Sequence, residues 1–185
     1  MSGNKLVIRV SNKNDLRYVQ TIVNEIELAS TDPSTSILKR SPQLIASKLE
    51  NGEAIIAVTK SGTWVGFCYL QLWSEGKFVA NCGLVVAPAF RRIGVANLIK
   101  KQIVALSREI YPQAKLFGLT TSLAVMKINS DLGYKPVTYS EITTDTGFWA
   151  GCRNCPNHAI LEKRKGKNCL CTAMLFETEN ALQNI

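Results

Sequence analysis

The sequence predicts an α+β domain in α/β/α layers, with a mixed, mostly antiparallel sheet of about seven strands flanked by helices. Short apolar runs of strand length alternate with segments whose apolar residues recur at spacings of three and four, which gives the order β-α-β-β-β-α-β-α-β. A Cys-rich insert precedes the last strand. The 185 residues suffice for one hydrophobic core and are few for two, so we expect a single domain over residues 1–185, with an insert at 144–168.

The amino-terminal third predicts one strand and two helices. Leu6–Val10 has the composition of a strand, and Asn14 or Asp15 is placed to cap a helix with apolar residues at helical spacing up to Ile26. Residues 34–49, which Pro42 interrupts, predict a turn followed by a short helix that ends at Asn51-Gly52.

The centre of the chain predicts an antiparallel meander, and the rest alternates helix and strand. The meander is formed by the runs Ala54–Thr59, Trp64–Trp73 and Phe78–Ala87, which short polar turns separate. A long helix follows within residues 92–110, with its lysines on the face opposite the apolar positions. The remaining predicted elements are the strand Leu116–Thr121, the helix Leu123–Leu132 and the strands Tyr134–Thr143 and Cys171–Phe176, which we expect to pair.

Composition limits the classes of protein that remain. Hydrophobic residues make up 46% and charged residues 19%, as in globular proteins, and no apolar stretch approaches the ~20 residues of a membrane span. With no signal peptide at the start, we expect a cytoplasmic protein with no membrane partner. The net charge of +8 favours anionic partners in general. We expect no nucleic-acid partner. The sequence is compatible with a homodimer and does not decide the oligomeric state.

A strand-to-helix loop at residues 85–96 has the features of a phosphate site. Arg91-Arg92-Ile93-Gly94-Val95-Ala96 follows a buried strand and opens the long helix, whose first N–H groups point outward with partial positive charge. Small residues at positions 94 and 96 let phosphates approach the backbone, and the two arginines add charge-assisted hydrogen bonds. The alternative is that the small residues only allow helix packing and that the arginines are solvated.

This loop resembles the Arg/Gln-x-x-Gly-x-Gly/Ala motif of the GNAT superfamily of acetyltransferases at every defined position, and the resemblance extends along most of the chain. It implies a donor substrate, acetyl-CoA or another acyl-CoA, and transfer of its acyl group to an amine. The resemblance implies that this strand splays from its neighbour and binds the pantetheine arm. The coenzyme-binding residues it implies are Leu84, Val85, Val86, Arg91, Arg92, Ile93, Gly94, Val95 and Ala96.

One position departs from the family. Its Tyr-x-x-x-Gly-Phe segment corresponds to Asn129 through Gly133-Tyr134, so Asn129 stands where a tyrosine often protonates the thiolate leaving group. An amide has no proton for this task, and a water or another hydroxyl must replace the tyrosine.

The acceptor is suggested by a more specific similarity, to the acyltransferase domain of N-acetylglutamate synthases. Ser36 to Leu44, Lys115 to Thr121 and Gly133 to Val137 carry it. It implies that Lys39 and Arg40 bind carboxylates of a small amino acid such as glutamate, and a bidentate guanidinium favours Arg40. The alternative is a solvated basic turn.

Two departures leave the proton transfers open. Ser122 replaces an arginine that usually follows the Thr-Thr pair, and the predicted strand from Phe78 holds no acidic residue to act as base. Glu75, in the turn before that strand, is the nearest carboxylate in sequence and is therefore a candidate base. The alternative is that Glu75 is only a solvated turn residue. The amine could also lose its proton through ordered water.

The carboxy-terminal cysteines form two close pairs, Cys152/Cys155 and Cys169/Cys171. Four thiolates so spaced predict a candidate structural zinc site, in which His158 could replace one ligand. Alternatively they are free thiols, with Cys169 and Cys171 on one face of the last strand.

These observations predict an N-acyltransferase acting on a small-molecule primary amine. Other amino acids and aminoglycoside-like amines are alternative acceptors. The second hypothesis is also an enzyme, a protein N-acetyltransferase. A third reading, from a different class, is a catalytically weak acyl-CoA-binding or zinc-stabilised interaction module.

Overall fold

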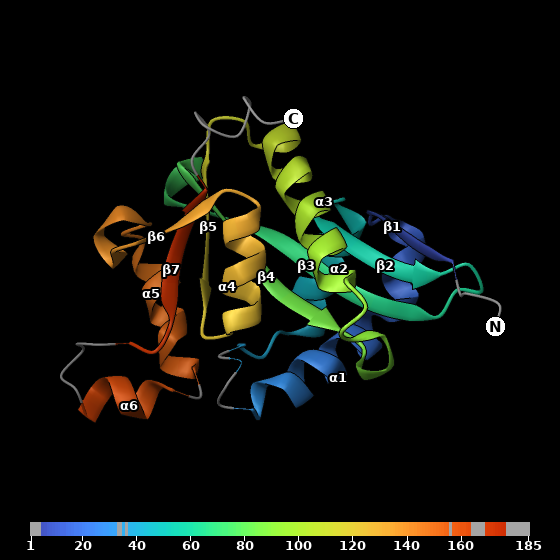
Figure 1. Ribbon diagram of the computed structural model, residues 1–185, viewed down its shortest axis with the longest axis horizontal. Helices are drawn as coiled ribbons and strands as arrows, with labels where there is room; N and C mark the ends of the chain where they lie inside the picture. Colours follow the sequence, from blue (N-terminus) through green and yellow to red (C-terminus); the bar gives the residue numbers. More distant parts are fainter. Residues whose placement is uncertain (1–4, 33–34, 36, 156, 164–168, 177–185) are drawn as a thin grey trace.

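The computed structural model describes residues 5–32, 35, 37–155, 157–163 and 169–176 (Figure 1). The strands of this part are β1 Leu6–Val10, β2 Ala54–Thr59, β3 Trp64–Trp73, β4 Phe78–Val86, β5 Lys115–Thr120, β6 Tyr134–Val137 and β7 Thr172–Phe176. Its α-helices are α1 Val19–Ser30, α2 Pro42–Glu50, α3 Val95–Ile110, α4 Leu123–Asp131, α5 Thr146–Gly151 and α6 His158–Lys163.

All seven described strands form one sheet, in the order β1-β2-β3-β4-β5-β7-β6. Every neighbouring pair is antiparallel except β4 and β5, which are parallel. The predicted mixed, mostly antiparallel sheet is therefore confirmed. The last strand does pair with β6, and it also inserts between β5 and β6, so it links both halves of the carboxy-terminal sheet.

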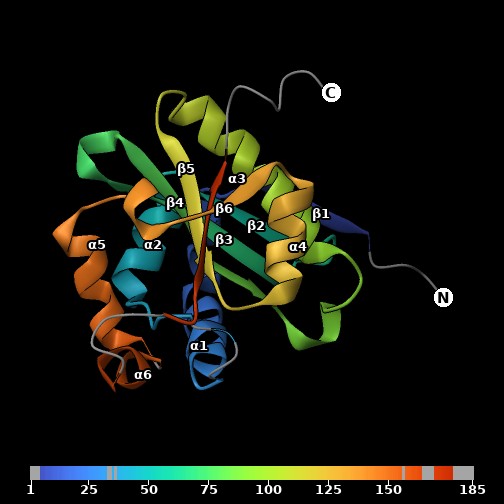
Figure 2. The same cartoon turned by 60° about the vertical axis from the view of Figure 1, so that its left-hand side comes forward.

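Helices cover both faces of the sheet (Figures 1 and 2). Successive residues of β2 show the two faces: Ile55 and Ala57 pack in the core beneath α3 and α4, whereas Ile56 packs in the core beneath α1 and α2. Both side-chain sets are apolar, so β2 is buried throughout, as expected for a central layer between helices. Of the helices described, none combines the length and the apolar character that a bilayer crossing requires.

The first helix begins later than predicted. Asn12, not Asn14 or Asp15, is the cap, and it starts a 3-10 helix over Lys13–Tyr18 that precedes α1. Asp15 completes the capping box by accepting the backbone N–H of Asn12. Its buried carboxylate also pairs with Arg9 of β1 at 2.7 Å, so this residue ties the turn to the sheet.

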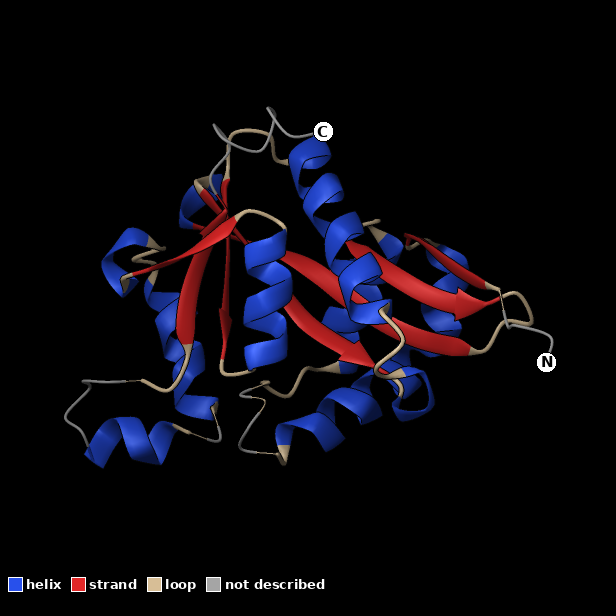
Figure 3. Ribbon diagram, viewed as in Figure 1, coloured by secondary structure: helices blue, strands red, loops and turns tan. Residues whose placement is uncertain are grey.

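Two further boundaries differ from the prediction. The strand after α4 ends at Val137 and not at Thr143, because Thr138 and Glu141 form the capping box of a 3-10 turn. Downstream, the described part of residues 144–168 is mostly helical and contains α5, a 3-10 turn over Cys152–Asn154 and α6 (Figure 3). Pro156 and residues 164–168 of the predicted insert, like Ser34 and Ser36 near the predicted acceptor segment, lie outside the described residues.

Candidate active site

Strands β4 and β5 separate after a short paired stretch. Only Phe78, Val79 and Ala80 pair with β5, although β4 continues to Val86 and β5 to Thr120 (Figure 1). The carboxyl halves of these two parallel strands are therefore not bonded to each other. This separation agrees with the splay that the resemblance implies.

A β-bulge bends β4 at the same place. Phe67 pairs with Val85 and Tyr69 with Cys82, so β4 holds one residue more than β3 over this stretch. Gly83 has φ +64°, and a Cβ there would lie 2.8 Å from the Tyr69 ring. Glycine is thus required both by the dihedral angle and by the contact.

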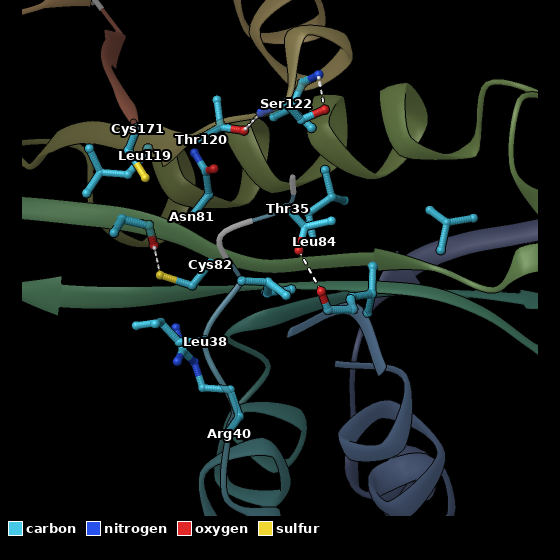
Figure 4. Close-up of a pocket in the computed structure, with 18 of the residues that line it drawn as sticks. Thr35, Leu38, Arg40, Asn81, Cys82, Leu84, Leu119, Thr120, Ser122 and Cys171 are labelled. Atoms are coloured by element: carbon cyan, nitrogen blue, oxygen red, sulfur yellow. Dashed lines mark hydrogen bonds between the residues drawn. The ribbon is translucent and has the colours of Figure 1, made fainter. Parts of the chain in front are cut away.

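A cavity of about 530 Å³ occupies the space between the separated strands. Its walls come from β4 and β5, from α1, from the segment before α2, from the turn before α3 and from α4 and the α5 region. Figure 4 shows Arg40 and Leu38 on one side of this cavity, Thr120 and Ser122 on the other, and Cys82 between them.

The loop between β4 and α3 closes one end of the cavity. Arg91 lines it and donates from Nε to the carbonyl of Val86 at 2.9 Å. Arg92 and Gly94 have φ +64° and +86°, so the backbone turns sharply and α3 begins at Val95, later than the predicted 92–110. Among the described residues no side chain caps α3, which leaves the N–H groups of its first turn for water or a ligand.

The nine predicted coenzyme residues divide into two groups. Leu84, Val85, Val86 and Arg91 line the cavity. Residues 92–96 form the turn and the first residues of the helix beside it. Within this second group Arg92, Ile93 and Gly94 are exposed, whereas the Val95 side chain is buried in the core.

The side chains of Lys39 and Arg40 lie in different surroundings. Arg40 lines the cavity and donates from Nε to the hydroxyl of Tyr69 at 2.5 Å. Burial raises the pKa of this tyrosine, so the hydroxyl stays neutral. Lys39 is exposed, pairs with Glu27 at 2.5 Å and does not line the cavity.

The two predicted catalytic residues also differ in position. Asn129 of α4 lines the cavity and is 1% exposed; its Nδ2 lies 3.5 Å from Met174 Sδ, and its Oδ1 has no hydrogen-bond partner among the described residues. Glu75 is exposed in the turn before β4 and does not line the cavity. The fold thus brings only the amide to the site.

Sequence reasoning missed the acidic residues that do line the cavity, Glu25 of α1 and Asp32. Glu25 lies three positions after the buried Ile22, at the edge of the buried face of its helix. That spacing was the available signal, but a polar residue at the border of an apolar stripe is ordinarily solvated.

One lysine of the long helix does not lie on the exposed face that the sequence predicts. Lys101 is exposed as expected, but Lys100 is 1% exposed and lines the cavity. Lys100 Nζ donates to Asn81 Oδ1 at 2.6 Å, and Asn81 Nδ2 donates to the Tyr134 hydroxyl at 2.6 Å. Burial lowers the pKa of Lys100 to about 8.

A second cavity, of about 40 Å³, lies beside the first and is lined by all four carboxy-terminal cysteines and by His158. Burial, followed by the neighbouring thiols of Cys169 and Cys155, raises the pKa of Cys152. Within the described ranges, however, no group of three or more His, Cys, Asp or Glu side chains is arranged to hold a metal ion. The observed arrangement does not fit the predicted zinc site.

Neither a family model nor a curated protein matches the sequence. Solved structures do match. N-acetylglutamate synthase from Neisseria gonorrhoeae, complexed with coenzyme A and N-acetyl-glutamate, has a TM-score of 0.62 at 16% identity, over 93% of this chain and 35% of that one. A Mycobacterium tuberculosis protein in complex with CoA and NLQ has a TM-score of 0.63 at 18% identity, over 92% and 98%.

A third match is the diaminobutyrate acetyltransferase EctA from Paenibacillus lautus, with its substrate and coenzyme A, which has a TM-score of 0.55 at 16% identity over 73% and 81%. The chain thus spans about a third of the Neisseria synthase and nearly all of the Mycobacterium chain. The chain has the fold of the GNAT acetyltransferases. At these identities the likeness concerns the fold alone.

Proposed function

We propose that this protein is an acyl-CoA-dependent N-acyltransferase that moves an acetyl or other short acyl group to the primary amine of a small amino acid such as glutamate. The observation that carries the proposal is the continuity of the cavity. It begins beside the uncapped amino terminus of α3 and passes between the separated strands β4 and β5.

The donor end suits a pyrophosphate linked to an extended arm. The N–H groups of the first α3 turn, with Arg91 beside them, supply positive charge and donors for phosphate oxygens. Along Leu84–Val86, β4 has no β5 partner, and the Val86 carbonyl accepts a hydrogen bond from Arg91. The other outer backbone groups of this stretch can bond the amides of pantetheine as a strand would. This arrangement supports acyl-CoA as the donor.

The other end suits a small acceptor with both charges of an amino acid. Arg40 is held against Tyr69 and offers a guanidinium to a carboxylate. Glu25 and Asp32 in the same cavity favour an ammonium group. Since these groups line one cavity of about 530 Å³, the size of a small-molecule site, we favour a small molecule over a protein acceptor.

The reaction needs no covalent enzyme intermediate. The neutral amine attacks the thioester carbonyl, the oxyanion accepts a hydrogen bond from an unpaired β4 N–H, and the thiolate leaves as the amide forms. Asn129 lies where it can orient water through its unsatisfied Oδ1, but it cannot serve as the acid. The position of Glu75 gives no support for its predicted role as base.

Other predictions remain proposals that the acyltransferase function does not require. A structural zinc ion lacks support from the observed cysteine geometry. A homodimer and a cytoplasmic location rest on the sequence alone.

The direct test is to incubate the purified protein with acetyl-CoA or succinyl-CoA and a panel of amino acids while free thiol is measured. We expect thiol release that depends on the amine, with the lowest KM for a dicarboxylic amino acid. N-blocked glutamate, which keeps the carboxylates but lacks the amine, is the matched control and must give no release.

Three outcomes would contradict parts of the proposal. No binding of acetyl-CoA or coenzyme A at millimolar concentration would remove the donor assignment. Binding without turnover of any amine would favour an acyl-CoA-binding module. Turnover confined to peptides with free amino termini would favour a protein N-acetyltransferase.

A further inference from the structure

The cavity wall contains a buried lysine that the reaction described above does not use. Lys100 Nζ has one hydrogen-bond acceptor, Asn81 Oδ1, and lies 4.9 Å from the centre of the Tyr134 ring. Among the described residues no carboxylate pairs with it. Burial of an ammonium group without a counter-ion is costly, which points to a function for Lys100 at the cavity.

The anchor of this lysine marks the point where the strands part. Asn81 directly follows Ala80, the last β4 residue paired with β5. Opposite it, Gly118 of β5 leaves room for the amide, because a Cβ at position 118 would lie 3.2 Å from Asn81 Oδ1. Lys100 is therefore fixed where the splay begins. A pantetheine arm that runs along β4 from the α3 end of the cavity would bring its thioester toward this point.

The lysine also lies on the donor side of the sheet. It belongs to α3, whose amino terminus is the proposed phosphate site, and α4 with Asn129 covers the same face. Arg40 and Glu25, the proposed acceptor contacts, reach the cavity from the segments on the opposite face. The leaving sulfur is thus expected nearer to Lys100 than the attacking amine is.

Resting on the acyltransferase function, we propose that Lys100 is the catalytic proton donor to the coenzyme A thiolate. The amine nitrogen bonds to the carbonyl carbon, the C–S bond breaks, and its electron pair on sulfur takes a proton from the Lys100 ammonium. Coenzyme A leaves as a thiol, and Lys100 is left as a neutral amine. The proton that the new amide nitrogen loses returns to Lys100 through water, which restores the ammonium.

The acidity of the group suits this step. The titratable groups facing Lys100 are Cys68 of β3, Cys82 of β4 and Tyr134 of β6, and burial raises the pKa of all three. They stay neutral near pH 7 and do not compensate the charge. With its pKa lowered to about 8 by burial, Lys100 is about as acidic as an alkyl thiol, so proton transfer is nearly balanced.

The test compares Lys100→Met with Lys101→Met, the exposed neighbour on the same helix, using the acyl-CoA and amine found for the wild-type chain. We expect Lys100→Met to lower kcat roughly 100-fold while KM for acyl-CoA stays nearly constant. Lys101→Met should leave both unchanged. We expect Lys100→Met to stay folded, since a neutral side chain of similar length suits a buried site, and thermal unfolding measures this.

A pH profile distinguishes proton donation from a structural role. Wild-type kcat should fall as the pH rises through about 8, because the ammonium is then lost. Lys100→Arg keeps the charge but does not titrate, so it should be slow and should lack this alkaline decline. An alkaline decline that persists in Lys100→Arg would overturn the proposal.

Two other results would also overturn it. One is an unchanged kcat in Lys100→Met. The other is a rise confined to the KM of the acceptor, which would make Lys100 a carboxylate contact. Both differ from failure of the proposed function, in which the wild-type chain itself transfers no acyl group.

Discussion

Arg40 and Lys39 are adjacent in sequence, but the fold gives them different surroundings. The hydrogen bond to Tyr69 holds Arg40 in the cavity wall, whereas Lys39 pairs with Glu27 in solvent. An exposed pair of this kind contributes little to stability or binding. The pair of residues therefore provides its own internal control for the acceptor site.

We predict that Arg40→Gln raises KM for a dicarboxylic acceptor by roughly 10- to 100-fold. This is the loss of affinity expected when hydrogen bonds to a charged group are removed. KM for acyl-CoA should not change, since Arg40 reaches the cavity from the segment before α2, on the face of the sheet opposite to α3. Steady-state kinetics with each substrate varied in turn measures both constants. Lys39→Gln is the control, and an equal effect of the two substitutions would show that a general positive field, and not a specific contact, attracts the acceptor.

At the scale of single elements, two glycines share a backbone conformation but not a place in the fold. Gly94 before α3 has φ +86° and Gly76 before β4 has φ +87°, and a Cβ at either position would have no atom within 4 Å. Replacement by alanine therefore carries the same backbone cost at both, about 1–2 kcal/mol of unfolding free energy. Only Gly94 adjoins the proposed phosphate site.

We predict that Gly94→Ala and Gly76→Ala lose similar stability, but that Gly94→Ala alone raises the Kd for coenzyme A, by roughly tenfold, the worth of one charge-assisted hydrogen bond. Chemical denaturation and calorimetric titration measure the two quantities. Undiminished affinity in Gly94→Ala would contradict the assignment of this loop to phosphate.

Elements with a strong periodic signal could be predicted, and positions decided by tertiary contacts could not. The meander and the loop at residues 85–96 were visible because apolar runs, turn residues and glycine leave local signals. The burial of Lys100 left none, since its partners Asn81 and Tyr134 are distant in sequence. The entry of Glu25 into the cavity likewise depends on how α1 packs, and local propensity does not encode that.

For the molecule as a whole, the splay divides the sheet into β1–β4 and β5–β7, which three residue pairs join directly. A coenzyme bound along the splay would contact both parts, and a ligand that binds only the folded state raises its stability. The nucleotide end alone would contact only the α3 end of the cavity. Full-length coenzyme and its nucleotide fragment should therefore stabilise the chain in different ways.

We predict that coenzyme A at 100 times its Kd raises the free energy of unfolding by about 2.7 kcal/mol, which for this size of chain is about 5–10 °C in Tm. Hydrogen exchange should slow in β4 beyond Ala80 and in β5, where backbone N–H groups lack partners across the splay. At matched saturation, a fragment that ends at the pyrophosphate should give protection at the start of α3 but not in β5. Protection of β5 by the fragment as well would mean that the two parts of the sheet respond as one unit, and that the pantetheine arm is not what joins them.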